Sequence, residues 1–137
     1  SYKMNNKSTK ILTEISPGEL LDKISILEIK LIKIKDKKKI QEINKEYQSL
    51  LNTKNNMIKD EKDLNSLIFK IKDVNLKLWE IEDKIRICEK NKDFGDSFIQ
   101  LARDVYLNND ERAKIKYSIN KLLGSNFIEI KDYAPYK

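Results

Sequence analysis

The sequence predicts an all-α fold, an antiparallel helical bundle with long coiled-coil-like helices. From residue 64 to residue 88, apolar residues recur at alternating steps of three and four, which is the seam spacing of a coiled coil. The same spacing recurs between residues 20 and 34. We expect the chain to be organised around residues 57–91, whose apolar seam is Met57, Leu64, Leu67, Ile71, Val74, Leu78, Ile81, Ile85 and Cys88.

The composition indicates one soluble helical domain. The chain has 137 residues, of which 36% are charged and 39% are hydrophobic, a balance typical of a folded helical protein. We expect residues 1–10 to be disordered and tag-derived, residues 11–132 to form a single helical domain, and residues 133–137 to be a loose tail. No apolar run approaches the ~18 residues of a membrane span. A single cysteine fits a reducing compartment, so we expect a cytoplasmic protein without membrane contact.

Strong start signals mark a helix after Ser16. Ser16 can act as the N-cap, Pro17 suits the first helical position, and Glu19 can complete a capping box. The helix is apolar on two sides, because its seam is accompanied by a second row made of Ile26, Ile29 and Ile32. We expect the second row to be covered either by another part of this chain or by a second subunit.

The apolar phase slips at residues 35–39. A break with Asp36 as a new N-cap explains the slip, and so does one bent helix over residues 17–52. Residues 52–56 are polar and predict the turn before the organising helix. Leu78 belongs to the seam of that helix, so we expect Leu78→Ala to lower the free energy of unfolding by about 2–5 kcal/mol.

The last third of the chain predicts two further helices. Residues 93–95 form a tight corner, and the short helix that follows carries Phe98, Leu101, Ala102 and Val105 on one face. The run Asn-Asn-Asp-Glu at residues 108–111 predicts the start of a separate last helix, which Gly124 ends. Residues 127–130 alternate like a strand, and we expect a small two-stranded β element in which they pair with residues 11–15.

The net charge of +6 comes almost entirely from lysine. Arginine occurs only at Arg86, Arg103 and Arg112, and the chain is rich in Ile and Asn, the bias of an AT-rich genome. We therefore expect most lysines to form a solvated face, and residues 37–39 are the likeliest exception. Nucleic acid is not the expected partner.

A second, polar stripe lies beside the seam of the organising helix. Asn75, Trp79, Glu82 and Arg86 are spaced four, three and four. A tryptophan in a polar row needs a surface to cover and a partner for its N–H, and arginine supplies bidentate geometry for anions. The residues that we expect to bind a ligand are Trp79, Glu82, Arg86, Arg103, Tyr106, Arg112 and Lys116.

Two interpretations of this cluster stay open. One is a pocket for an anionic small molecule. The other is an ion-pair network that locks the helices together, joining Arg86, Arg103 and Arg112 to Glu82, Asp83 and Asp110. We expect an additional polar site among Glu19, Asp22, Lys23, Lys30 and Asp110.

The sequence carries no pattern for catalysis or metal binding. Without histidine, the chain has no Ser-His-Asp triad, Cys-His pair or histidine metal site. Cys88 occupies a seam position and is interpreted as a core residue. We predict no catalytic residue, no metal site and no cofactor, and the chain is more simply a binding protein than an enzyme.

Four strings in order are familiar together: SPGELLDKISILEIKL at 16–31, LWEIEDKIR at 78–86, DFGDSFIQLARDVYLNNDERAKIK at 93–116 and INKLLGS at 119–125. Over roughly residues 12–136, the chain closely resembles a family of unknown function found in tailed phages and in bacteria. Some members accompany sugar-transferring or surface-polysaccharide genes. The resemblance implies one shared domain, no established reaction and, for a phage source, the host cytoplasm. It marks as typical Glu19, Asp22, Lys23, Glu28, Lys30, Glu82, Asp83, Arg86, Asp93, Arg103, Asn109, Asp110 and Arg112.

The function we predict is a non-enzymatic helical binding module that self-associates and holds an anionic small molecule, such as a nucleotide or a sugar phosphate. In a phage it would sequester a host signal. One alternative is a protein-interaction or scaffold domain linked to surface-polysaccharide synthesis. Another rests on a looser similarity to the all-helical chorismate mutases, which surround a dicarboxylate with Arg and Lys but whose arginine-led first-helix motif is absent here. The last alternative is nucleic-acid binding by the lysine face.

Overall fold

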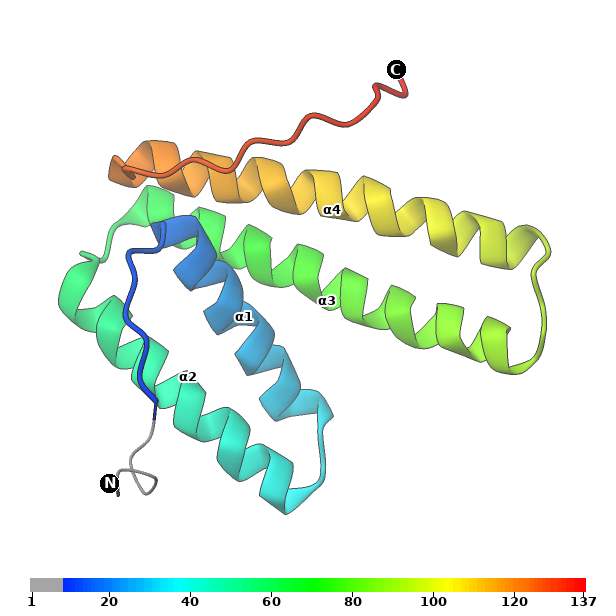
Figure 1. The fold of residues 1–137 in the computed structure, drawn as a ribbon, viewed down its shortest axis with the longest axis horizontal. Coiled ribbons are helices and arrows are strands. Elements are labelled where there is room, and N and C mark those ends of the chain that lie inside the picture. Colours follow the sequence, from blue (N-terminus) through cyan, green and yellow to red (C-terminus); the bar gives the residue numbers. More distant parts are fainter. Residues whose placement is uncertain (1–8) are drawn as a thin grey trace, which may run out of the picture.

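The computed structural model describes residues 9–137, and Figure 1 shows their arrangement. The predicted all-α class is confirmed. Residues 1–8, part of the predicted disordered N-terminus, lie outside the described residues. The four helices are α1 (Pro17–Lys33), α2 (Lys37–Met57), α3 (Lys62–Lys90) and α4 (Asp96–Leu123).

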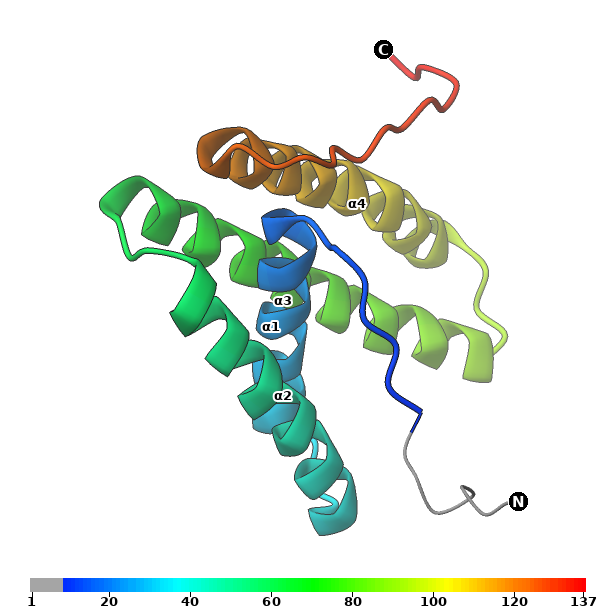
Figure 2. The same cartoon turned by 60° about the vertical axis from the view of Figure 1, so that its left-hand side comes forward.

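The helices form two antiparallel hairpins that lie across one another (Figures 1 and 2). α1 runs against α2, and α3 runs against α4. Among the described helices, α1 alone lies against all three others, whereas α2 lies only against α1. Crossed hairpins with α1 between them therefore replace the single antiparallel bundle that the sequence predicts.

The core surrounds α1 rather than α3. Eight of the 17 residues of α1 are buried, but only four of the 29 residues of α3 are. The second apolar row explains this difference, because Ile29 is 2% exposed and Ile26 is half-buried, so this chain covers both, while Ile32 is 61% exposed. The buried apolar cluster consists of Leu20, Leu21, Ile24, Leu64, Ile71, Val74, Ile115 and Ile119.

The start of α1 follows its sequence signals with one exception. Ser16 Oγ accepts a hydrogen bond from the Glu19 N–H at 3.2 Å, and Pro17 is the first helical residue. The Glu19 side chain does not complete a capping box. It forms an ion pair with Lys116 of α4 at 2.6 Å instead, and so ties α1 to α4.

The predicted break between the first two helices is confirmed. Asp36 Oδ1 accepts hydrogen bonds from the N–H groups of Lys38 and Lys39 at 2.9 and 3.2 Å, which makes it the N-cap of α2. The predicted turn at residues 52–56 is wrong, because this stretch contains neither Gly nor Pro and α2 continues through it. Met57 is 77% exposed at the end of α2 and does not belong to the seam of α3.

α3 and α4 are single long rods. The unbroken rod predicted over residues 64–88 is present in α3. The two helices predicted on either side of Asn108 are one helix, because the Asn108 side chain donates to the carbonyl oxygen of Asp104 at 2.9 Å instead of capping a new helix. Gly124 ends α4 with φ of 63°, as its position predicts.

The predicted β element is absent, since residues 9–137 contain no strand. The side chains of Ile11 and Ile130 are 84% and 82% exposed, so burial of an apolar face does not drive the pairing. The two segments meet through one hydrogen bond, from Asn126 Nδ2 to Glu14 Oε2 at 3.0 Å. Residues 125–137 then run back along α4 (Figure 1).

Candidate ligand-binding cleft

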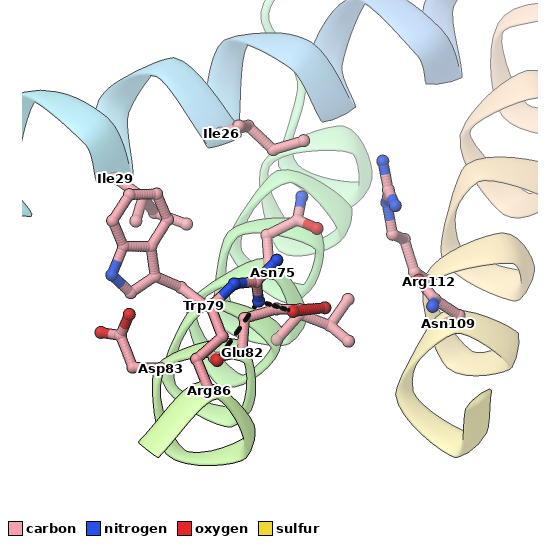
Figure 3. Close-up of a pocket in the computed structure, with 10 residues that line it drawn as sticks. Ile26, Ile29, Asn75, Trp79, Glu82, Asp83, Arg86, Asn109 and Arg112 are labelled. Atoms are coloured by element: carbon pink, nitrogen blue, oxygen red, sulfur yellow. Dashed lines mark hydrogen bonds and ion pairs between the residues drawn. The ribbon is translucent and has the colours of Figure 1, made fainter. Parts of the chain in front are cut away.

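A cleft of about 480 Å³ lies between α1, α3 and α4 (Figure 3). Its volume falls within the range of small-molecule sites. Apolar side chains come from α1 and α3, and polar side chains come from α3 and α4. The lining residues are Ile26, Ile29, Asn75, Leu78, Trp79, Glu82, Asp83, Arg86, Asn109 and Arg112.

The polar stripe predicted on α3 faces this cleft. Spacing of four, three and four places its members on one side of the helix, and all of them line the cleft: Asn75, Trp79, Glu82 and Arg86. The second apolar row of α1 provides the opposite wall through Ile26 and Ile29. The half-buried ring of Trp79 extends toward Ile29, so the surface that this tryptophan covers belongs to α1 (Figure 3).

A buried carboxylate lies next to the cleft. Asp22 of α1 is 3% exposed, and its two oxygens accept hydrogen bonds from Arg112 Nε and Nη2 at 2.8 and 2.5 Å. Asn75 Nδ2 donates to the same carboxylate at 2.9 Å and to Ser25 Oγ at 2.8 Å. The hydrogen bonds that Arg112 itself donates to Asp22 raise the pKa of Arg112 above its ordinary value. One carboxylate thus links the three helices that form the cleft.

From the sequence, Asp22 is expected in a separate polar site and not as the partner of Arg112. A signal for the pairing was present. Asp22 and Ser25 are polar residues within a helix that is apolar on two sides, so folding buries them and they need polar partners.

The rim of the cleft carries an exposed ion pair. Arg86 donates to the carboxylate of Glu82 one turn earlier in α3, and the Arg86 side chain is 71% exposed. Such pairs on a helix surface contribute about 0.2–0.5 kcal/mol. An anion that enters the cleft can therefore replace Glu82 at little cost in free energy.

Several hydrogen-bond donors at the cleft have no acceptor among the described residues. They include the indole N–H of Trp79 and Nη1 of Arg112, whose remaining nitrogens donate to Asp22. Both groups remain able to donate to a ligand.

Two predicted ligand-binding residues lie on α4 outside the cleft. Arg103 is exposed and forms no ion pair with any described residue. Tyr106 packs edge-to-face on Tyr136 of the C-terminal segment, with ring centroids 5.6 Å apart. The predicted ion-pair network therefore forms only in part. Arg86 pairs with Glu82, Arg112 pairs with Asp22 instead of a predicted acid, and Arg103 has no acid partner within residues 9–137.

Lys116, the third predicted residue outside the cleft, is a structural cation. Its side chain is 10% exposed and bridges Glu19 of α1 and Glu129 of the C-terminal segment, at 2.6 and 3.1 Å. Burial lowers the pKa of Lys116, but the hydrogen bonds to both carboxylates outweigh burial and raise it.

The additional polar site does not form as one site. Glu19 and Asp22 are close together beside Lys116 and Arg112, and the other three lie elsewhere: Lys23 beside Glu46, Asp110 beside Tyr136, and Lys30 at a cavity between α1 and α2.

The described part of the chain offers no other obvious chemistry. It holds no group of three or more His, Cys, Asp or Glu side chains placed to bind a metal ion. Cys88 is half-buried on α3 rather than part of the core. None of the helices in residues 9–137 combines the length and the hydropathy needed to cross a bilayer.

Comparison with known proteins adds a family to this geometry. Residues 11–136 match a family described as a family of unknown function, DUF6165. The chain belongs to this family. The DUF6165 match covers both hairpins, the cleft and the C-terminal segment. No curated protein and no solved structure matches the chain.

Proposed function

We propose that this DUF6165 protein is a non-enzymatic binding module whose cleft holds a small anionic molecule of the nucleotide or sugar-phosphate kind. One observation carries the proposal: the only tryptophan of the chain and two of its three arginines line the same cleft. Aromatic faces favour flat or apolar rings, and guanidinium groups favour phosphate oxygens.

The apolar wall has room for the ring of such a ligand. The ring of the ligand lies beside Ile26, against the part of the Trp79 indole that does not pack on Ile29. Asp83 and Asn109 offer acceptor oxygens at the edge of this wall, and these suit the hydroxyl groups of a sugar.

The phosphate of the ligand binds to the two arginines. Arg86 exchanges Glu82 for the phosphate, because the Arg86–Glu82 ion pair is exposed and weak. Arg112 uses Nη1, while its other two nitrogens remain on Asp22 and hold the guanidinium in place.

The charge balance of the lining favours binding of one small anionic group. Two acids, Glu82 and Asp83, offset the two arginines. A polyanion such as nucleic acid is disfavoured, because the two acids repel its further phosphates.

Fluorescence of the single tryptophan tests the proposal directly. We expect a ligand from a panel of mononucleotides, cyclic and dinucleotides, and sugar phosphates to change the emission of Trp79 and to raise the Tm. At 100 times its Kd, such a ligand stabilises the fold by about 2.7 kcal/mol. Arg86→Gln should raise the Kd about tenfold or more by removing a charged hydrogen bond.

Arg103→Gln is the matched control, because it removes the same charge from an exposed site outside the cleft. Its Kd and Tm should equal those of the wild type. The proposal is overturned if no compound in the panel changes the emission or the Tm, or if Arg103→Gln weakens binding as much as Arg86→Gln does.

The biological setting is a further part of the proposal. The Lys-, Ile- and Asn-rich composition, typical of AT-rich genomes, supports a phage source. In a host cell such a module lowers the free concentration of a nucleotide signal. The alternative, a scaffold in surface-polysaccharide synthesis, differs in its prediction, since it requires a protein that co-purifies with the chain rather than a ligand in the cleft.

A further inference from the structure

The end of the α1–α2 hairpin carries a dense group of lysines. This end lies apart from α3 and α4 in both views of the fold (Figures 1 and 2). We name residues 30–39 the basic tip, and its lysines are Lys30, Lys33, Lys35, Lys37, Lys38 and Lys39. Asp36 is the only acid of the basic tip. With six lysines and one acid, the tip has a net charge of +5, against +6 for the whole chain.

A lysine-rich composition alone does not account for this charge. Residues 59–63, around the start of α3, are also exposed and rich in lysine, but they read Lys-Asp-Glu-Lys-Asp and have a net charge of −1. In the basic tip the lysines are not interspersed with acids in this way. None of the six forms an ion pair with a described residue.

Three of these lysines occupy positions that are unfavourable for their own helix. Lys37, Lys38 and Lys39 form the first turn of α2, which contains no acid. Cations are disfavoured there, because the first turn is the positive end of the helix dipole. Asp36 caps the backbone N–H groups of this turn but forms no ion pair with the three ammonium groups. Charges that the fold itself disfavours indicate a role outside folding.

An apolar groove of about 380 Å³ adjoins these lysines, between the end of α1 and the start of α2. Its apolar residues are Ile34 and Ile43, and its polar ones are Lys30, Lys38, Lys39 and Glu42. Three of the four charged side chains are therefore cations. An apolar surface with cations beside it is complementary to an amphiphile whose polar group is an anion.

These features favour a lipid surface over a nucleic acid. Residues 30–43 contain no arginine for bidentate contacts and no aromatic ring on which a base could stack. A sugar–phosphate backbone also offers no apolar partner for Ile34 and Ile43. Lysine clusters attract anionic lipid headgroups without requiring a fixed geometry.

We propose that the basic tip docks on the surface of a bilayer that contains anionic lipids. The ammonium groups lie among the headgroup phosphates, and the groove with Ile34 and Ile43 faces the boundary with the acyl chains. Contact of this kind needs no spanning segment, whereas the expectation of no membrane contact rests on the lack of a long apolar run. The docking does not depend on the ligand of the cleft.

Sedimentation with lipid vesicles tests the docking. We expect the wild type to bind phosphatidylcholine vesicles that contain about 30% phosphatidylglycerol, and not vesicles of phosphatidylcholine alone. Binding should weaken as salt rises from about 0.05 to 0.5 M, because salt screens the attraction. The triple variant Lys37→Gln, Lys38→Gln, Lys39→Gln should lower the partition coefficient about 100-fold, or about fivefold for each lysine. Ile34→Ser should lower it about threefold or more by removing apolar contact.

The matched control is the triple variant Lys59→Gln, Lys62→Gln, Lys114→Gln, which removes the same charge from exposed positions outside the basic tip. It should bind as the wild type does, and circular dichroism checks that every variant is folded. The proposal is overturned by a wild type that does not bind anionic vesicles at low salt, or by a control that weakens binding as much as the tip variant does. Ile34→Ser with wild-type binding removes the role of the groove. Tighter binding to duplex DNA than to vesicles, lost in the tip variant, assigns the tip to nucleic acid instead.

Discussion

Asp22 accepts hydrogen bonds from two other helices while it is 3% exposed. Asp22→Ala leaves Arg112 and Asn75 without this acceptor. We expect the free energy of unfolding to fall by about 3 kcal/mol, the low end for breaking a buried pair, because water reaches the Arg112 side chain, which is 30% exposed. Urea denaturation measures the loss, and the exposed Lys38→Ala, expected to cost less than about 0.5 kcal/mol, is the reference. Equal losses in the two variants would contradict the role given to Asp22.

Gly18 is required by close packing between α1 and α4. Its N–H donates to Asn120 Oδ1 at 2.7 Å, and an added Cβ would lie 2.8 Å from the Lys116 carbonyl oxygen. Gly18→Ala should therefore destabilise the fold by about 1–3 kcal/mol through overpacking. Gly95→Ala is the control, because its Cβ would meet only ordinary contact at 3.4 Å. A pair of variants with the same Tm would refute this reading of the contact.

Lys116 makes the fold sensitive to alkaline pH. Burial lowers its pKa, but hydrogen bonds to Glu19 and Glu129 raise it above the ordinary value of 10.5. The folded state thus holds this proton more tightly than the unfolded state does, so the stabilisation is present below pH 10.5 and is lost as the pH rises through the folded-state pKa. Thermal melts up to about pH 12 should show a steeper fall of Tm for the wild type than for Lys116→Met. Parallel curves would exclude the linkage.

At the scale of elements, the seam of α3 is regular throughout but its burial is not. Ile71 is 0% exposed, whereas Leu78 is half-buried and lines the cleft. Ile71→Ala should cost about 2–5 kcal/mol as a cavity. The regular spacing alone predicts the same cost for Leu78→Ala. Because water already reaches Leu78, we expect this variant to lose only about 1 kcal/mol of the free energy of unfolding. Chemical denaturation of both variants measures the two losses. A larger loss for Leu78→Ala than for Ile71→Ala would contradict the burial assigned to these two residues.

Helix existence and the strongest caps could be predicted from the sequence because they depend on local chemistry. Ser16, Asp36 and Gly124 each act on backbone groups within a few residues of themselves. The turn at 52–56 and the helix start at 108–111 could not be predicted, because Asn favours caps only when a competing helix is not already continuous. The β pairing of residues 11–15 failed for a non-local reason, since neither segment gains a buried face.

At the scale of the whole molecule, the stripe on α3 was predictable and its surroundings were not. Helical periodicity places Trp79 and Arg86 on one face whatever lies opposite. Which residues of α4 reach that face depends on the level at which α1 and α4 meet α3. At that level Arg112 pairs with Asp22 beside the cleft, whereas Arg103 lies outside the cleft, about nine residues or 13 Å farther along the helix.

The crossed hairpins predict an uneven distribution of stability along the molecule. α1 is covered by three helices. The ends of α3 and α4 at residues 78–107 form a two-helix arm that contains no buried residue. Amides of the arm should therefore exchange hydrogen faster than those of α1 in dilute protein, because local opening exposes less apolar surface there. Mass spectrometry of peptides measures both, and equal protection of α1 and the arm in dilute protein would show that the fold is a single cooperative unit.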